Sequence, residues 1–218
     1  AVLADGTVIP AMNRMLKNNA AYDVKQLFIG TEGTLGVITR LVLRLRESPR
    51  STQSALVACP TFTDVTRFLK HIDAALGGSL SASELMWNEF YRMVTTPPSK
   101  GTPPLPQTYD YYVLVESAGG DPARDQAQFE EAIAAAIEAG LVVDAVVCAS
   151  EAQREALWAL RDDVEGIFRL GMPVAFDVSL PLAEMEGYVT EVVGRLEREW
   201  PAYCRFVFGH LGDGNLHI

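Results

Sequence analysis

Short apolar runs alternate with longer amphipathic stretches over most of the chain. Runs rich in β-branched and aromatic residues predict strands, and apolar residues three or four positions apart predict helices. The expected strands cover 54–59, 81–86, 109–117, 141–148, 174–180 and 204–210. The expected helices run from Thr61 or Thr63 to residue 75 and over 121–140, 150–170 and 182–200. Because the strand connections also permit antiparallel pairing, we predict an α+β fold, an antiparallel sheet with its helices on one face, and not a doubly wound parallel fold.

The first fifty residues follow a different pattern. The segment VLADGTVI at 2–9 predicts a hairpin that turns at Asp5-Gly6, and ITRLVLRLR at 38–46 predicts a strand. The polar, proline-containing stretch 47–54 follows and is the best candidate for a domain boundary. Farther on, the run TTPPSKGTPPLPQ at 95–107 predicts a mobile loop, because proline removes a backbone donor and restricts the residue before it.

Composition narrows the classes of partner and compartment. Eighteen basic and 28 acidic residues give a formal net charge of −10, which opposes binding to nucleic acid or to an anionic membrane surface. No apolar run approaches the length of a membrane span, and we expect a cytoplasmic protein. The three cysteines, Cys59, Cys148 and Cys204, stand far apart among apolar residues, which predicts buried free thiols in a reducing compartment. The chain lacks a starting Met and ends inside a motif, so we expect a piece of a longer protein.

Three stretches carry candidate chemistry. The first is IGTEGTLGVIT at 29–39, where Gly30, Gly33 and Gly36 recur every third position without the order of a nicotinamide-type phosphate loop. Backbone free of side chains at these points can approach a flat or anionic ligand closely. A glycine-rich turn between two strands explains the same spacing, so both interpretations stay open.

The second stretch is HLGDGNLHI at 210–218. A turn at Gly212 and Gly214, fixed by the side chains of Asp213 and Asn215, would bring His210 and His217 to one centre. Two imidazoles suit a divalent metal such as zinc, which normally takes at least three protein ligands. Two loop histidines without a metal are the competing interpretation. The remaining histidine, His71, is expected on a helix surface.

The third stretch is LWALRDDVEGIF at 157–168, in which Arg161 borders an apolar helical stripe. An arginine there can clamp a substrate carboxylate through two parallel hydrogen bonds. It can equally pair with Asp162, Glu165 or another acid.

Together with VLADGTVI, FDVSLPL and the segment at 17–39, these stretches resemble the flavin-linked D-2-hydroxy-acid dehydrogenases. This family includes flavin-type D-lactate dehydrogenase, D-2-hydroxyglutarate dehydrogenase and the glycolate oxidase D subunit, within the vanillyl-alcohol-oxidase-like superfamily. The resemblance implies that residues 1–46 form the C-terminal edge of an FAD-binding domain. It implies that residues 50–218 form the substrate or cap domain, a ferredoxin-like sheet with flanking helices that is incomplete at its C-terminus.

The resemblance also implies roles for individual residues. Arg161 would bind the substrate carboxylate, and His210 and His217 would bind a divalent metal, with zinc the metal implied. The third metal ligand and the catalytic base are expected beyond Ile218. The backbone that contacts FAD would be that of Gly30, Thr31, Glu32, Gly33, Thr34, Gly36, Val37 and Ile38. The implied partners are a small 2-hydroxy acid and an electron acceptor of unspecified identity, and a homodimer is left open.

The implied reaction is metal-assisted transfer of a hydride from the substrate's C2 to the flavin. The chain departs from D-2-hydroxyglutarate dehydrogenases at Glu165, where they have threonine, and at Ala175, where they have lysine. Gain of an acid and loss of a cation favour a monocarboxylate such as D-lactate. Ala21 also replaces a usual glycine, which weakens one expected flavin contact.

Two rival interpretations remain. One is a flavin oxidase of the same superfamily that acts on an alcohol or aldehyde without using the metal. The other is a flavin-free ligand-binding or interaction module, which would use the acidic helix at 121–139 as its partner face. We also expect the 218 residues alone to be inactive and to hold no flavin.

Overall fold

The computed structural model describes residues 1–99 and 101–218 and divides them into two compact units, Ala1–Ser48 and Pro49–Ile218. In the N-terminal unit, Val2 forms antiparallel bridges with Val8 and Val37. The predicted hairpin is confirmed, since Gly6 has a φ of 85° and its amide donates to the Leu3 carbonyl at 3.0 Å. The unit also holds a short 3₁₀ helix, η1 (Val24–Leu27). No residue of this unit is buried.

The strand predicted at 38–46 is wrong, because the structure has no regular element between Val37 and Ser51. Strand conformation is stable where a neighbouring strand accepts and donates the backbone hydrogen bonds. The alternating residues of 38–46 have no such neighbour among the described residues, and they are exposed.

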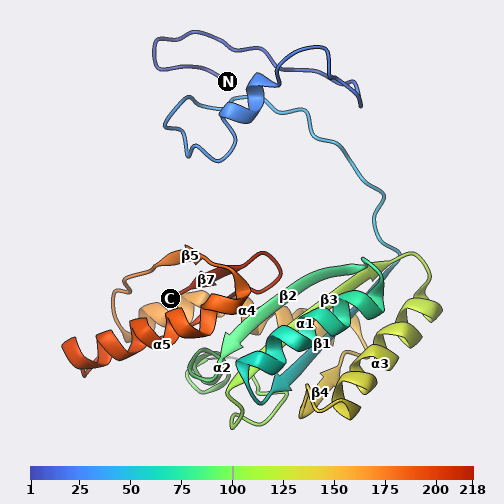
Figure 1. Cartoon of the computed structure of the whole chain (residues 1–218), viewed down its shortest axis with the longest axis vertical. Helices are drawn as coiled ribbons and strands as arrows, with labels where there is room; N and C mark the ends of the chain where they lie inside the picture. Colours follow the sequence, from blue (N-terminus) through green and yellow to red (C-terminus); the bar gives the residue numbers. More distant parts are fainter. Residues whose placement is uncertain (100) are drawn as a thin grey trace. The chain divides into compact units, whose positions relative to one another are not determined.

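The larger unit contains one seven-stranded sheet in the order β4-β1-β3-β2-β6-β7-β5 (Figure 1). Every neighbouring pair is antiparallel, so the predicted α+β class is confirmed. All six strands predicted from residue 54 onward are present, although several are shorter than expected, and β7 adds a strand within the terminal motif. The strands are β1 (Ser51–Cys59), β2 (Leu80–Trp87), β3 (Tyr111–Gly119), β4 (Asp144–Val147), β5 (Asp177–Ser179), β6 (Phe208–His210) and β7 (Asn215–His217).

Helices connect these strands, and most begin and end at the predicted signals. The Thr61 hydroxyl accepts the Asp64 amide at the start of the first helix, which ends at Gly77 with a left-handed φ of 60°. The predicted helix at 150–170 is α-helical only to Asp162 and continues as a 3₁₀ helix, and one short helix was not predicted. The helices are α1 (Phe62–Leu76), α2 (Asn88–Thr95), α3 (Pro122–Glu138), α4 (Glu151–Asp162), η2 (Asp163–Leu170) and α5 (Leu182–Glu199).

The helices cover both faces of the sheet, which corrects the prediction that they lie on one face. Alternate residues of each strand point to opposite sides. Val57 and Val113 pack with α1, α3 and α5, whereas their neighbours Leu56 and Leu114 pack with α2 and α4. Figure 1 shows α1 and α3 side by side on one face. The central strands therefore carry apolar residues on both faces, as strands that are buried on both sides do.

The proline-rich run contains no helix or strand at 96–99 and 101–107, which confirms the loop there, whereas its first residue, Thr95, ends α2; Lys100 lies outside the described residues. Its far end is attached to α2 by Tyr91. The Tyr91 hydroxyl donates to the Leu105 carbonyl at 2.8 Å and accepts the Leu105 amide at 3.0 Å. Burial raises the pKa of Tyr91, so this hydroxyl keeps its proton and can serve both bonds.

The cysteines are free, as predicted, but only Cys59 is buried; Cys148 is half-buried and Cys204 is exposed. The expectation of three buried thiols is therefore wrong for two of them.

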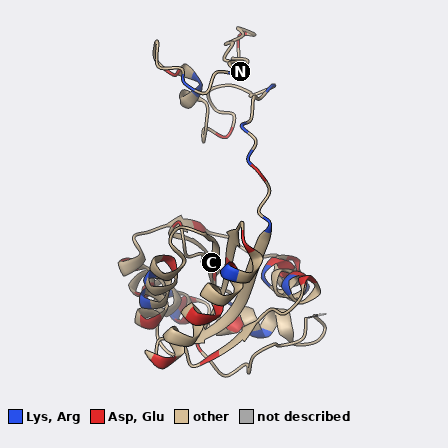
Figure 2. Cartoon of the chain, turned by 90° about the vertical axis from the view of Figure 1, so that its right-hand side faces the viewer, with Lys and Arg blue, Asp and Glu red and all other residues tan. Residues whose placement is uncertain are grey.

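Acidic residues outnumber basic ones on the helices of the larger unit, and both signs are interspersed (Figure 2). Among the described residues, no helix is both long and apolar enough to cross a bilayer.

Candidate active site

Glu84 and His210 form a cross-strand pair at the centre of the candidate site. Residue 84 of β2 lies opposite residue 210 of β6 in the register, so both side chains emerge on the sheet face that α4 covers. Glu84 is only 6% exposed as a residue, and its Oε1 lies 2.8 Å from His210 Nδ1. The strand pairing thus sets the position of the imidazole, and the carboxylate sets its orientation.

Arg161 reaches the same carboxylate from α4. Its Nε donates to Glu84 Oε2 at 2.8 Å, and its Nη2 lies 3.5 Å from His210 Nε2. The arginine is 7% exposed, and its guanidinium carbon lies 5.2 Å from the centre of the Phe208 ring. Of the alternatives left open by the sequence, pairing with another acid is realised, while Asp162 is a longer contact at 3.8 Å and Glu165 is exposed.

His217 completes the cluster from β7. Its ring centre lies 5.5 Å from that of His210 and 5.0 Å from that of Phe208. Asp177 of β5, its partner in the strand register, has Oδ2 3.8 Å from His217 Nδ1. The structure therefore brings His210 and His217 together, as the motif suggested, and it places Arg161 beside His210.

The pKa of His217 is lowered, mainly because partial burial disfavours the charged ring. The charge of Arg161 acts in the same direction, and the carboxylate of Asp177 opposes it. The neutral imidazole, which is the form that binds metals and accepts protons, is favoured at this position.

The hairpin between β6 and β7 depends on two glycines. Gly214 has a φ of 80°, and a Cβ added at Gly209 would lie 2.2 Å from the Asn215 carbonyl oxygen. Gly212 has neither a positive φ nor an atom near a Cβ position, so Gly209 replaces it as the second required glycine. The Asp213 side chain fixes the turn, as predicted, by accepting a hydrogen bond from the backbone N–H of Asn215 at 3.1 Å. The side-chain amide of Asn215 does not fix the turn but donates to Asp177.

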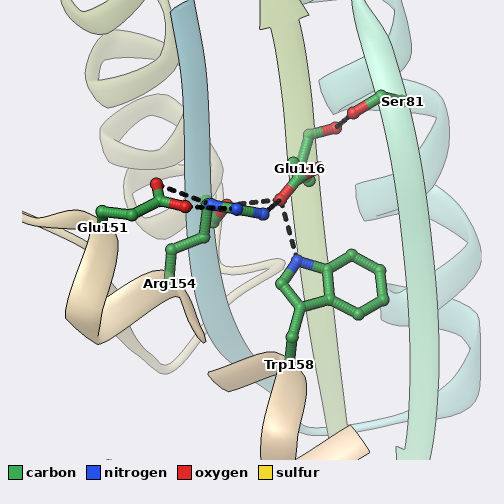
Figure 3. A network of polar contacts seen from close by, with 6 residues as sticks. Ser81, Glu116, Glu151, Arg154 and Trp158 are labelled. Carbon is green, nitrogen blue, oxygen red and sulfur yellow. Dashed lines mark hydrogen bonds and ion pairs between the residues drawn. The ribbon is translucent and has the colours of Figure 1, made fainter. Parts of the chain in front are cut away.

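A second glutamate attaches α4 to the sheet next to the candidate site. Figure 3 shows Arg154 and Trp158 of α4 converging on Glu116 of β3. Trp158 Nε1 donates to Glu116 Oε2 at 2.8 Å and Arg154 Nη1 donates to the same oxygen at 3.2 Å, while Ser54 donates at 3.0 Å. Arg154, Trp158 and Arg161 are spaced four and three residues apart, so they share one helix face. The Glu116 contacts fix this face against the sheet and thereby place Arg161 over Glu84.

The cluster offers an incomplete set of metal ligands. Two imidazoles face one region, and Asn215 Oδ1 is buried without a hydrogen-bond partner among the described residues. However, no group of three or more His, Cys, Asp or Glu side chains within residues 1–99 and 101–218 is arranged to hold a metal ion. Both ring nitrogens of His210 also have protein partners, Glu84 and Arg161. The donor types fit a divalent metal, and the number of ligands does not suffice for one.

The glycine segment at 29–39 lies in the N-terminal unit and forms consecutive turns. Gly30 and Gly33 have φ values of 80° and 81°, and Glu32 adopts a φ of 50°. Gly36 is required by close packing, since its Cβ would lie 3.0 Å from the Val2 carbonyl. The following residue bridges to Val2, so a glycine-rich turn leading into an extended segment describes this geometry; its contact with FAD remains a prediction.

A pocket of about 730 Å³ opens on the other side of β2, between α1 and the turn after β6. Thr66, Lys70, Ser83 and Asp213 are among its lining residues, and Glu84 and His210 contribute to its border.

His71 was expected on a helix surface, but it is half-buried. Its Nε2 contacts the Ala132 carbonyl of α3 at 2.9 Å, so it joins two helices.

Residues 48–218 match the family described as FAD linked oxidases, C-terminal domain. The chain belongs to this family. Over its whole length it is 38% identical to mitochondrial D-2-hydroxyglutarate dehydrogenase of Bos taurus and 32% identical to D-2-hydroxyglutarate dehydrogenase of Xanthomonas citri pv. viticola. It is also 35% identical to a putative mitochondrial D-lactate dehydrogenase of Schizosaccharomyces pombe. The chain spans 39%, 45% and 43% of these relatives, respectively.

Solved structures of alkyldihydroxyacetonephosphate synthase share the fold of this FAD linked oxidase domain. Two of them match with TM-scores of 0.62 and 0.64 at 15% identity, covering 93% of this chain and 42% and 41% of theirs. At this identity the likeness concerns the fold alone. It agrees with the antiparallel sheet and flanking helices that the sequence predicted.

Sequence reasoning found Arg161, His210 and His217 but missed Glu84 and Asp177. Glu84 left a signal, because it is an acid inside the otherwise uncharged strand LSASELMW. A charge in a buried strand requires a partner. Asp177 gave no comparable signal, since a short exposed strand tolerates an acid.

Proposed function

We propose that the protein containing this chain oxidises D-2-hydroxy acids to 2-oxo acids, with FAD as the hydride acceptor. Membership of the FAD linked oxidase family supports the cofactor. The observation that carries the proposal is the convergence of Arg161, His210 and His217 on one sheet face. A 2-hydroxy acid presents a carboxylate and a hydroxyl on adjacent carbons, and a guanidinium beside two imidazoles offers partners for both groups.

Arg161 would bind the substrate carboxylate through its Nη atoms, because Glu84 already occupies Nε. His210 and His217 would face the 2-hydroxyl and orient it. FAD, when bound, would take the hydride from C2, which is the chemistry that the cofactor contributes. Burial of Arg161 and the Phe208 ring beneath it exclude water from the guanidinium, which strengthens its attraction for a carboxylate.

We also propose His210 and His217 as two ligands of a divalent metal, with zinc matching the donor type. Such an ion would polarise the hydroxyl as a Lewis acid. The neutral state favoured for His217 supports ligation, and the unpartnered Asn215 Oδ1 supplies a further oxygen close by in sequence. The ligand set within the described residues is incomplete, so further ligands would come from elsewhere in the working enzyme.

The N-terminal unit would contribute to the FAD site. We propose that residues 1–46 belong to the FAD-binding domain and that the backbone from Gly30 to Ile38 lies against the flavin. Consecutive turns built largely from exposed residues in this segment support that role.

For the substrate, we propose a preference for a monocarboxylate such as D-lactate. Arg161 is the cation of the cluster, Glu165 adds a negative charge one turn farther along the chain, and Ala175 offers no positive charge. A second substrate carboxylate would therefore lack a cationic partner. The sequence had suggested that a buried unpaired acid would disfavour a dicarboxylate. Because Glu165 is exposed, its effect on a second carboxylate is one of charge repulsion.

The test uses the complete gene product. Its flavin absorbance is recorded before and after addition of D-lactate, D-2-hydroxyglutarate, glycolate, or a simple alcohol or aldehyde, each with and without a chelator. Bleaching by D-lactate that the chelator prevents is the expected result. Bleaching that ignores the chelator would remove the metal from the proposal, and bleaching only by simple alcohols or aldehydes would favour the alternative oxidase. A preparation without flavin would overturn the proposal and favour a binding module.

A further inference from the structure

We infer that Glu84 is the positioning residue of this site: it fixes the tautomer of His210 and the orientation of Arg161 at once. Its two carboxylate oxygens have separate partners, Oε1 with His210 Nδ1 and Oε2 with Arg161 Nε, both at 2.8 Å. The catalytic meaning of this role rests on the proposed function. The geometric role does not depend on it.

The partners of His210 determine which ring nitrogen carries the proton. A carboxylate accepts hydrogen bonds and donates none, so Nδ1 beside Glu84 is the protonated nitrogen. A guanidinium donates and accepts none, so Nε2 beside Arg161 presents its lone pair. Both contacts lead to the same tautomer. In this tautomer Nε2 carries the lone pair that a metal ion or a hydroxyl proton requires, and either one would replace the 3.5 Å contact with Arg161.

Glu84 also limits the freedom of Arg161. The guanidinium is planar, so a bond from Nε fixes the direction in which both Nη atoms point. With Nε bound to Glu84, Nη2 is held toward His210. One buried carboxylate therefore sets the distance between the carboxylate-binding group and the imidazole.

α4 can be attached to the sheet by a glutamate that does not orient a histidine. Glu116 lies on the same sheet face and accepts Arg154 and Trp158 of the same helix through a single oxygen, with no histidine involved. The two glutamates thus form a matched pair, in which Glu116 attaches the helix and Glu84 attaches the helix and orients the site.

The first experiment is nuclear magnetic resonance of the histidine ring nitrogens in the 218-residue chain. The chain has three histidines, so single His71 and His217 substitutions assign the signals. Wild type is expected to show His210 protonated on Nδ1. In Glu84→Gln the amide has one accepting and one donating end and cannot accept from both partners, so the Nε2-protonated form should increase. Glu116→Gln is the control and should leave His210 unchanged.

Glu84→Asp keeps two accepting oxygens and is expected to retain the Nδ1-protonated form, which provides a rescue if Glu84→Gln fails to fold. A His210 ring protonated on Nε2 in wild type would overturn the inference. An unchanged His210 signal in folded Glu84→Gln would overturn it as well.

A second measurement uses the flavin-containing gene product. Glu84→Gln should lower the rate of flavin reduction by about 10- to 100-fold, the range typical for residues that orient catalytic groups, with a partial recovery in Glu84→Asp. A normal rate in Glu84→Gln would contradict the catalytic meaning. If no 2-hydroxy acid reduces the flavin of wild type, the proposed function fails, whereas the tautomer measurement still decides the geometric role.

Discussion

Glu84 and Arg161 form a buried ion pair between positions 77 residues apart in the sequence, with Glu84 Oε2 2.8 Å from Arg161 Nε. Their side chains are 7% and 8% exposed. Two charges removed from water to this extent must remain paired. The loss of either one leaves the other buried without a partner, which destabilises the fold.

Glu84→Ala is therefore expected to lower the free energy of unfolding by about 3–5 kcal/mol, the cost of leaving a buried charge without its partner. Urea unfolding followed by circular dichroism measures the change. Glu191→Ala is the control, since the Glu191–Arg195 pair is exposed on α5 and should change stability by less than about 0.5 kcal/mol. Equal effects of the two substitutions would show that burial of the Glu84 pair has no energetic consequence.

Gly209→Ala should destabilise the β6–β7 hairpin. Its Cβ would lie 2.2 Å from the Asn215 carbonyl and 2.9 Å from Leu216 Cα, and neither backbone atom can move aside without separating the strands. A loss of about 1–3 kcal/mol or more is expected from such overpacking. Gly212→Ala in the same motif meets no atom within 4 Å and should unfold like wild type. A stable Gly209→Ala variant would contradict the close approach of the two strands.

The three thiols should react in the order of their exposure. Burial raises the pKa of Cys59 to about 12, so its thiol is neutral as well as inaccessible in mildly alkaline buffer. A thiol-specific reagent should modify Cys204 first and Cys148 more slowly, and it should modify Cys59 only after unfolding. Cys204→Ser should remove the fastest phase. Persistence of that phase would mean that another thiol is the exposed one.

The 218-residue chain alone is expected to retain no flavin. Its N-terminal unit has no buried residue and so no core that could enclose an isoalloxazine ring. Purification in the presence of excess FAD, followed by gel filtration and visible spectroscopy, tests this. The complete gene product treated identically is the positive control, and a yellow 218-residue chain would refute the expectation.

Ala175→Lys should shift the substrate preference toward a dicarboxylate. A lysine would supply the cation that a second carboxylate lacks, and a charge-assisted hydrogen bond of about 1.5–3 kcal/mol corresponds to roughly tenfold or more in relative kcat/KM. The ratio of kcat/KM for D-2-hydroxyglutarate and D-lactate in the gene product is the measurement. Ala175→Met adds length without charge and should leave the ratio unchanged. A Lys variant with the wild-type ratio would argue against residue 175 as a determinant.

Local signals predicted much of this fold because they act over a few residues. The hydroxyl of Thr61 and the glycine at Gly77 delimit α1 as expected. The strand at 38–46 failed because alternation does not provide a partner strand. The helices were expected on one face for a related reason: no local pattern states which sheet face a helix covers. The short segment that forms α2 was also not predicted as a helix, although its apolar residues lie at helical spacing.

The candidate site was only partly predictable. Paired histidines and an arginine beside an apolar stripe are visible in the sequence. Glu84, which joins them, occupies a strand far away in the chain, and its pairing with His210 follows from the sheet order β2-β6 and not from any motif. The tautomer and the arginine orientation are therefore properties of the register.

The distance along the chain between Glu84 and its partners also governs when the site can assemble. His210 is 126 residues downstream, and β6, which carries it, inserts beside β2 after every helix of the unit has been made. Closing such a long loop is slow compared with helix formation. Until β6 pairs with it, β2 has one unpaired edge, and the Glu84 carboxylate stays hydrated. A chain truncated before β6 would contain every helix of the unit but would lack His210 and His217, and therefore the site. Ligand binding at this cluster is thus expected only after β6 has been synthesised and has paired with β2.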